Sequence, residues 1–126
     1  MYYKAKDQAL NNDHDYHIAA ILWRKKSPIR IGVNSKKTHP AARRQYSCGP
    51  RFVHHLHAEM HALLNTDTTK NDVLEVMRWT KDGQRTMSKP CEHCMKVIRA
   101  SGIKKVRYTD WDGTWTEMNL CAISMR

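Results

Sequence analysis

The first part of the chain carries two kinds of apolar pattern, one helical and one typical of strands. Small and apolar residues recur at helical spacing over residues 3–12, which predicts a first helix. The apolar run over residues 17–23 predicts a strand, and Ser27-Pro28 breaks the chain before a second apolar stretch over residues 29–34. We therefore expect these two strands to form a hairpin.

The middle of the chain opens with a long polar segment. Residues 35–53 are basic, contain prolines and a glycine, and show no periodicity, which predicts a long loop. Apolar residues then recur at i, i+4, i+7 and i+8, which predicts a second helix that begins near His57 and buries one side. These positions are Leu56, Met60, Leu63 and Leu64. Residues 73–80 alternate between apolar and polar and predict a third strand.

A third helix is predicted after the third strand. Pro90 suits the first turn of a helix, and apolar and cysteine residues repeat at helical spacing from Cys91 to Ser101. Gly102 is the residue that a left-handed helix end prefers. Residues 105–109 then predict a fourth strand.

The end of the chain predicts a second hairpin. Asp112-Gly113 is a strong turn signal, so residues 114–116 are expected to run antiparallel to the strand over residues 105–109. Predicted strands and helices interleave along the chain. The expected architecture is therefore a three-layer α/β/α fold, in which helices cover both faces of a mixed sheet.

Length and cysteine usage narrow the class of protein. Residues 1–126 have the length of one domain, and no apolar run approaches the roughly 20 residues that cross a bilayer. The first residues lack the charged-then-apolar order of a secretory signal. Cys91 and Cys94 are separated by two residues, which suits metal or redox chemistry better than a disulfide framework. We expect a soluble single-domain protein of a reducing compartment, the cytoplasm.

The charge of the chain suggests the chemistry of its partners. The formal net charge is +10, and the basic residues gather in short clusters. A surface this positive favours anionic partners, either phosphate-bearing small molecules or a nucleic-acid backbone. The competing explanation for any single basic cluster is that it only keeps the protein in solution and binds no partner.

Two short motifs carry the candidate chemistry, His57-Ala58-Glu59 and Pro90-Cys91-Glu92-His93-Cys94. Cys91 and Cys94 lie one helical turn apart and can point at one ion, and the positive end of the helix dipole favours their thiolates. His57 completes a three-ligand zinc site if the two helix starts converge. Three protein ligands leave a fourth position for water, which indicates catalysis. Glu59 would lie beside that water and could move its proton.

Other interpretations of these residues stay open. A Cys-x-x-Cys pair alone is also typical of structural zinc sites and redox motifs. A metalloprotease motif is not met, because Ala58 stands where that motif needs a glutamate. His61 and His93 are additional ligand candidates, although packing or hydrogen bonding is the commoner role. A second metal site is a further alternative, formed by residues just before the first motif: Cys48, His54 and His55.

The two motifs, followed by Ile98 and the segment from Gly102 to Tyr108, resemble the cytidine and deoxycytidylate deaminase superfamily over residues 17–108. The resemblance implies a five-stranded mixed sheet sandwiched by helices, a catalytic zinc, a pyrimidine that enters beside the metal, and a homo-oligomer. It also implies three substrate contacts. These are Asn34 to the sugar, the Ala58 N–H to the base carbonyl, and the Ser88 carbonyl to the amino group.

The implied reaction is hydrolytic deamination of a cytosine ring at C4. Glu59 would take a proton from water and deliver protons to N3 and to the departing nitrogen. The leading hypothesis is a free cytosine nucleotide or nucleoside as substrate, with dCMP the best single choice. Basic residues of the polar segment could engage its phosphate: Lys36, Lys37, Arg43 and Arg44.

Two other functions compete with this hypothesis. A deaminase of single-stranded DNA or RNA is motivated by the charge and by aromatic residues that could stack on bases: Tyr46, Trp111 and Trp115. A non-catalytic, zinc-stabilised module that binds nucleic acid is the other alternative. Glu59 discriminates against it, because a purely structural zinc site has no use for a carboxylate beside an open position.

Overall fold

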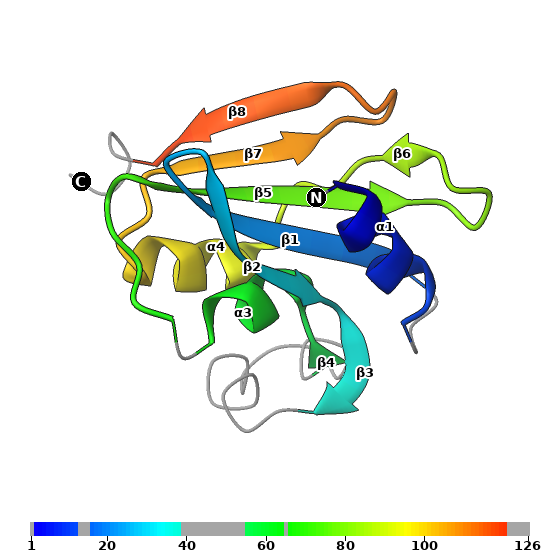
Figure 1. Ribbon diagram of the computed structural model, residues 1–126, viewed down its shortest axis with the longest axis horizontal. Coiled ribbons are helices and arrows are strands. Elements are labelled where there is room, and N and C mark those ends of the chain that lie inside the picture. The colour runs from blue at the N-terminus through cyan, green and yellow to red at the C-terminus, as the bar shows by residue number, and fades with distance from the viewer. Residues whose placement is uncertain (1, 13–15, 39–54, 65, 121–126) are drawn as a thin grey trace.

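A six-stranded mixed sheet organises the fold in a computed structural model that describes residues 2–12, 16–38, 55–64 and 66–120 (Figure 1). β6 (Arg85–Thr86) pairs with the end of β5, and the other strands form one continuous series. Their order is β2 (Ser27–Val33), β1 (His17–Arg24), β5 (Asp72–Trp79), β7 (Lys105–Thr109) and β8 (Trp115–Asn119). The expected five-stranded sheet is confirmed, and the short β6 is added to it.

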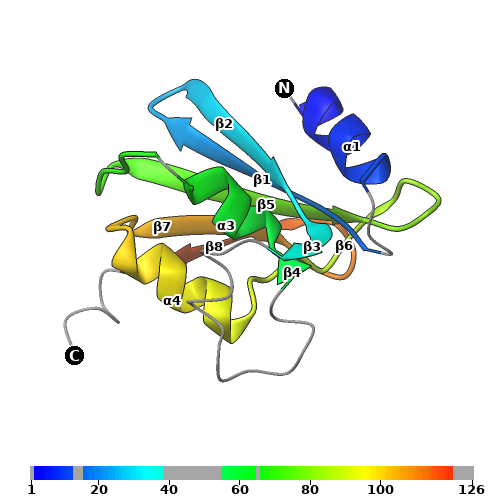
Figure 2. The ribbon, with the colours of Figure 1, turned by 90° about the horizontal axis from the view of Figure 1, so that it is seen from below.

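Helices cover both faces of the sheet, as Figure 2 shows. α1 (Tyr2–Leu10) lies on one face, and α3 (Ala58–Leu63) and α4 (Glu92–Ala100) lie on the other. Because successive residues of a strand point to opposite faces, Ala19 of β1 joins the core under α1, whereas Ala20 joins the core under α3 and α4. None of the helices in the described ranges is long and apolar enough to cross a membrane. The predicted three-layer α/β/α architecture is confirmed.

The connection from β5 through α4 to β7 determines where the ends of α4 lie. β5 and β7 are parallel neighbours, with Val73 opposite Lys105 and Val76 opposite Tyr108. A chain that leaves one parallel strand and enters the next must run back along the sheet, and α4 makes this return. The N-terminus of α4 therefore lies at the carboxyl end of β5, the edge at which open α/β sheets hold their ligands.

Both predicted hairpins are present. β1 pairs antiparallel with β2, and the turn between them places Lys25 at a φ of 57°. β7 pairs antiparallel with β8, from Lys105 opposite Asn119 to Thr109 opposite Trp115. Gly113 takes a φ of 83° in that turn, a backbone conformation that favours glycine. The Asp112-Gly113 signal thus predicted the turn correctly, although β8 extends beyond the predicted residues 114–116.

The polar segment over residues 35–53 contains structure that the sequence did not indicate. It begins with β3 (Ser35–Thr38), which pairs antiparallel with β4 (His55–Leu56) in a separate two-stranded sheet. β3 reads Ser-Lys-Lys-Thr and has no apolar alternation, so only its pairing partner makes it a strand. The prediction of an uninterrupted loop is wrong at residues 35–38, and residues 39–54 lie outside the described residues.

A buried glutamate lies under α1, on the face opposite α3 and α4. Glu75 accepts hydrogen bonds from the Tyr2 hydroxyl at 2.8 Å and from Trp23 Nε1 at 2.7 Å, and it forms an ion pair with Arg107. Burial, followed by the hydrogen bond to Glu75, raises the pKa of Tyr2 to about 12. The Arg107 guanidinium lies 5.0 Å from the centre of the Trp115 ring. Trp115 is therefore engaged on the α1 face, away from α3 and α4.

The first residue of β5 forms an ion pair that should make stability depend on pH. Asp72 is fully buried, and Arg24 of β1 contacts its two carboxylate oxygens at 3.1 Å. The hydrogen bond from Arg24 lowers the pKa of Asp72 below its ordinary value of 3.8, and bonds from Thr69 add to this effect. The ionised carboxylate therefore stabilises the fold at neutral pH, and this contribution is lost as the pH falls below 3.8.

We expect the Asp72→Asn variant to have a lower free energy of unfolding than the wild type at pH 7. The difference between the two proteins should shrink as the pH falls from 4 towards 2.5, because the wild-type carboxyl is then protonated as well. Urea titrations of both proteins across this range measure the difference. A difference that stays constant from pH 7 to pH 2.5 would contradict the assignment.

Candidate active site

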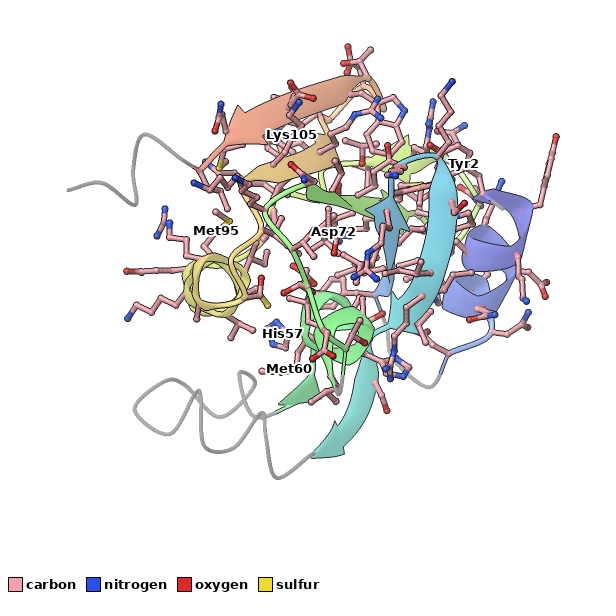
Figure 3. The ribbon with its side chains drawn as sticks, turned by 60° about the vertical axis from the view of Figure 1, so that its left-hand side comes forward. Tyr2, His57, Met60, Asp72, Met95 and Lys105 are labelled. Carbon is pink, nitrogen blue, oxygen red and sulfur yellow. The ribbon has the colours of Figure 1, made fainter. Side chains whose placement is uncertain are left out.

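The starts of α3 and α4 bring three potential metal ligands together. His57 Nδ1 lies 3.1 Å from the Cys94 sulfur and 3.6 Å from the Cys91 sulfur. One ligand atom from each of the three residues lies within 4.8 Å of the other two. Figure 3 shows the His57 side chain on the side of α3 that faces α4. The convergence that the two sequence motifs require is therefore present.

Helix capping positions place these donors. His57 is the N-cap of α3 and Cys91 the N-cap of α4, and both have extended backbones. The Cys91 sulfur accepts a hydrogen bond from the Cys94 N–H at 3.5 Å, in the manner of a capping oxygen. Hydrogen bonds from Cys94 and then from His57 lower the pKa of Cys91 to about 4, although burial opposes the shift. The Cys91 thiolate, which is the form that binds metals, is thus favoured at neutral pH.

Glu59 lies in the first turn of α3, two residues after His57, and its side chain is only 5% exposed. Burial raises the pKa of Glu59 above its ordinary range, and this effect outweighs the opposing attraction of His57. Burial alone would lower the pKa of His57, but the hydrogen bond to Cys91 and the charge of Glu59 raise it overall. A carboxylate with a raised pKa is a stronger base than an ordinary one, which suits a group that accepts a proton from water and returns it.

Close packing seats α3 directly on the sheet. A Cβ atom added to Gly32 of β2 would lie 2.4 Å from the Ala58 carbonyl oxygen and 2.4 Å from the Ala62 nitrogen. His61 Nδ1 accepts a hydrogen bond from the Val33 N–H at 3.0 Å, next along the same strand. Sequence reasoning did not assign Gly32 a role, and it left His61 as either a ligand or a hydrogen-bonding residue. Both residues fix the position of the helix that carries His57 and Glu59.

Ser88 ties the last residues of β7 to β5. Its hydroxyl donates to the Val76 carbonyl at 2.7 Å and lies 2.8 Å from the Thr109 hydroxyl. The Thr109 N–H donates to the Ser88 hydroxyl at 2.7 Å, and the Ser88 N–H donates to the Thr109 carbonyl at 2.9 Å. None of these bonds uses the Ser88 carbonyl, the group that the resemblance assigned to the substrate's amino nitrogen.

Asn34 follows β2 and is 5% exposed. Its side-chain oxygen accepts hydrogen bonds from Asn12 Nδ2 at 2.6 Å and from the Ile18 N–H at 3.0 Å. Its Nδ2 group donates to the Tyr16 carbonyl at 3.0 Å. Because the oxygen already accepts two bonds, Asn34 can contact a sugar hydroxyl only as a donor, through the second hydrogen of Nδ2.

Residues 1–110 match the family described as the cytidine and deoxycytidylate deaminase zinc-binding region. The chain belongs to this family. No curated protein matches the chain.

The deaminase fold is also found among solved structures. The chain is similar to the crystal structure of dCMP deaminase from the cyanophage S-TIM5 in apo form, with a TM-score of 0.51 and 21% sequence identity. The similarity covers 87% of this chain and 86% of the phage protein. At this level of identity the comparison supports the fold alone.

Zinc is the cofactor of this chain. The family description names a zinc-binding region, and the donors that meet in the structure are the types that zinc prefers, two cysteine sulfurs and one imidazole nitrogen. The lowered pKa of Cys91 adds to the fit, because a thiolate binds zinc without first losing a proton.

Several predicted site residues lie where the structure does not test them. Lys36 and Lys37 fall within β3, and His55 within β4, where only the backbone is described. His93 lies in α4 and is described in the same way. Four other candidates lie outside the described residues: Arg43, Arg44, Cys48 and His54. The phosphate-binding cluster and the second metal site thus remain predictions.

Proposed function

We propose that the protein is a hydrolytic deaminase that converts a free cytosine nucleotide or nucleoside, best represented by dCMP, to the uracil form with release of ammonia. In this proposal His57, Cys91 and Cys94 hold the zinc, and Glu59 is the catalytic residue. The observation that carries it is the meeting of the three donors beside a buried glutamate. Membership of the cytidine and deoxycytidylate deaminase family supports a cytosine compound, and the similar phage structure is of a dCMP deaminase.

Glu59 moves the protons of the proposed reaction. Zinc bound by the three donors supplies Lewis-acid activation of a water molecule. Glu59 accepts a proton from the attacking water and passes it to ring N3 while the water oxygen bonds to C4. The remaining proton on that oxygen then passes through Glu59 to the amino nitrogen, the C4–N bond breaks, and ammonia leaves a uracil ring. The raised pKa of Glu59 suits a group that accepts and returns a proton twice in each turnover.

The elements around Glu59 provide hydrogen bonds for the base and the sugar. Ala58 is the first residue of α3, and the first N–H groups of a helix have no acceptor within it, so Ala58 can donate to the base carbonyl. The Ser88 carbonyl accepts from the amino group, and Asn34 Nδ2 donates to the sugar. These contacts orient C4 towards the attacking water.

Ammonia release from free nucleotides tests this proposal. We expect the zinc-loaded protein to deaminate dCMP, and we expect activity to disappear with chelation and to return with added zinc. CMP, deoxycytidine and dCTP assayed in parallel define the sugar and phosphate requirement. The proposal fails if no compound in this set releases ammonia faster than it does with the Glu59→Gln variant.

A polynucleotide substrate is the second candidate, and one observation favours it. Trp111 is 71% exposed in the turn after β7, at the same end of the sheet as the start of α4. An exposed indole there, on a chain of net charge +10, could stack on an unpaired base. Binding to a single-stranded oligonucleotide should then weaken steeply with added salt, and salt-independent binding would remove this candidate.

A further inference from the structure

Arg78 lies near the carboxyl end of β5, on the face of the sheet that α3 and α4 cover. Leu74 and Val76 of β5 belong to the core under α3 and α4, whereas Met77 and Trp79 belong to the core under α1. Because side chains alternate along a strand, Arg78 shares the face of Leu74 and Val76. α4 starts at this end of β5, so Arg78 shares both a face and an edge of the sheet with the start of the helix that holds the cysteine ligands.

Arg78 also lies in one cross-strand row with Asn34, that is, in a line of residues that face one another on neighbouring strands. Arg78 is opposite Ile18 of β1, and the Asn34 N–H donates to the Ile18 carbonyl at 3.3 Å. The preceding row on this face is the one on which α3 is seated, and it consists of Gly32, Ala20 and Val76. From ordinary strand dimensions, Arg78 lies about 10 Å across the sheet from Asn34 and about 7 Å beyond the row that seats α3.

The guanidinium of Arg78 has the surroundings of an anion-binding group. It lies 4.7 Å from the centre of the Tyr16 ring, which holds its plane in place. Among the described residues, the other half-buried arginines have oxygen partners: Arg107 pairs with Glu75, and Arg30 donates to the Thr66 hydroxyl at 3.1 Å. In the same described part of the chain, Arg78 contacts the aromatic ring and has no carboxylate partner.

We propose that Arg78 binds the 5′-phosphate of the substrate, so that the enzyme acts on cytosine nucleoside monophosphates in preference to nucleosides. This inference rests on the proposed deaminase function. Arg78 and Asn34 flank the same strand position, Ile18, so a sugar held by Asn34 can direct its phosphate towards Arg78. The forked guanidinium can donate two parallel hydrogen bonds to phosphate oxygens. The Tyr16 ring orients the guanidinium before the substrate arrives. The phosphate supplies the oxygen partner that none of the described residues gives to Arg78.

The test compares substrates with and without the phosphate. For the zinc-loaded Arg78→Ala variant, we expect kcat/KM for dCMP to fall about 30-fold, because hydrogen bonds to a charged group are lost. kcat/KM for deoxycytidine should change less than about threefold. For Arg78→Lys, the loss in kcat/KM for dCMP should be smaller than about 30-fold but larger than about threefold. The lysine ammonium keeps the positive charge but cannot donate two parallel hydrogen bonds as the forked guanidinium does. The matched control is Arg99→Ala in the last turn of α4, which should leave both substrates unaffected.

Specific outcomes would overturn the inference. An equal loss for dCMP and deoxycytidine would assign Arg78 a purely structural role. If Arg78→Ala lowered kcat/KM only for cytosine within a single-stranded oligonucleotide and left dCMP unchanged, Arg78 would contact a polynucleotide substrate and not the phosphate of a free nucleotide. Calorimetric titration with dUMP and deoxyuridine, which need no turnover, separates this inference from the proposed reaction. If Arg78→Ala binds dUMP as tightly as the wild type does, the phosphate site is wrong whether or not the protein deaminates dCMP.

Discussion

Replacing Glu59 with glutamine is expected to lower the turnover of dCMP by about 100- to 10,000-fold, the range that a positioned general acid–base contributes. Glutamine has nearly the same shape but cannot accept a proton from water or return one to the ring. The side chain is only 5% exposed, and burial already favours its neutral form, so a neutral amide should not destabilise the fold. Ammonia release, zinc content by mass spectrometry and the midpoint of thermal unfolding measure the three consequences.

The matched control for this variant is Glu117→Gln on β8. Glu117 is exposed and lies 3.9 Å from Lys105 in a surface ion pair, so its loss should leave turnover and zinc content unchanged. Glu59→Gln protein that keeps its turnover would remove Glu59 from the mechanism. Loss of zinc in that variant would show that Glu59 supports the metal centre rather than moving protons.

Replacing Gly32 with alanine is expected to lower zinc affinity and turnover, although Gly32 is not itself a residue of the active site. The added Cβ would lie 2.4 Å from two backbone atoms of α3, and backbone atoms cannot rotate away as a side chain can. α3 must therefore shift, and His57 at its N-cap and Glu59 in its first turn shift with it. Overpacking of this kind costs about 1–3 kcal/mol of unfolding free energy, and a misplacement of about 1 Å costs about 100-fold in rate. Urea unfolding, zinc affinity and kcat for dCMP check these values.

Gly102→Ala separates this clash from the general effect of replacing a glycine. Within the described part of the chain, no atom lies within 4 Å of a Cβ added to Gly102, but its φ of +89° strains any other residue. The control should therefore lose about 1 kcal/mol of stability and keep its zinc affinity and turnover. If Gly32→Ala protein binds zinc and deaminates dCMP as the wild type does, α3 is not seated on β2 as described.

Local signals in the sequence determined most of the elements and the chemistry of the site. The apolar run of β1 reflects burial on both faces of a central strand, and Asp112-Gly113 encodes a turn whose glycine has a positive φ. The spacing of Cys91 and Cys94 encodes one helical turn. These features depend on a few neighbouring residues, so the sequence displays them directly.

Contacts between distant segments could be determined only in the tertiary structure. β3 and β6 are short and polar, and only their pairing partners make them strands. Gly32 matters because α3 lies on it, and Arg78 matters because the strand register puts it in one row with Asn34. Apolar periodicity records which side of an element is buried, but it does not record which element covers that side or in which register strands align. The sequence alone therefore determined the metal-binding chemistry, whereas the tertiary structure decided how that chemistry is held and which side chains surround it.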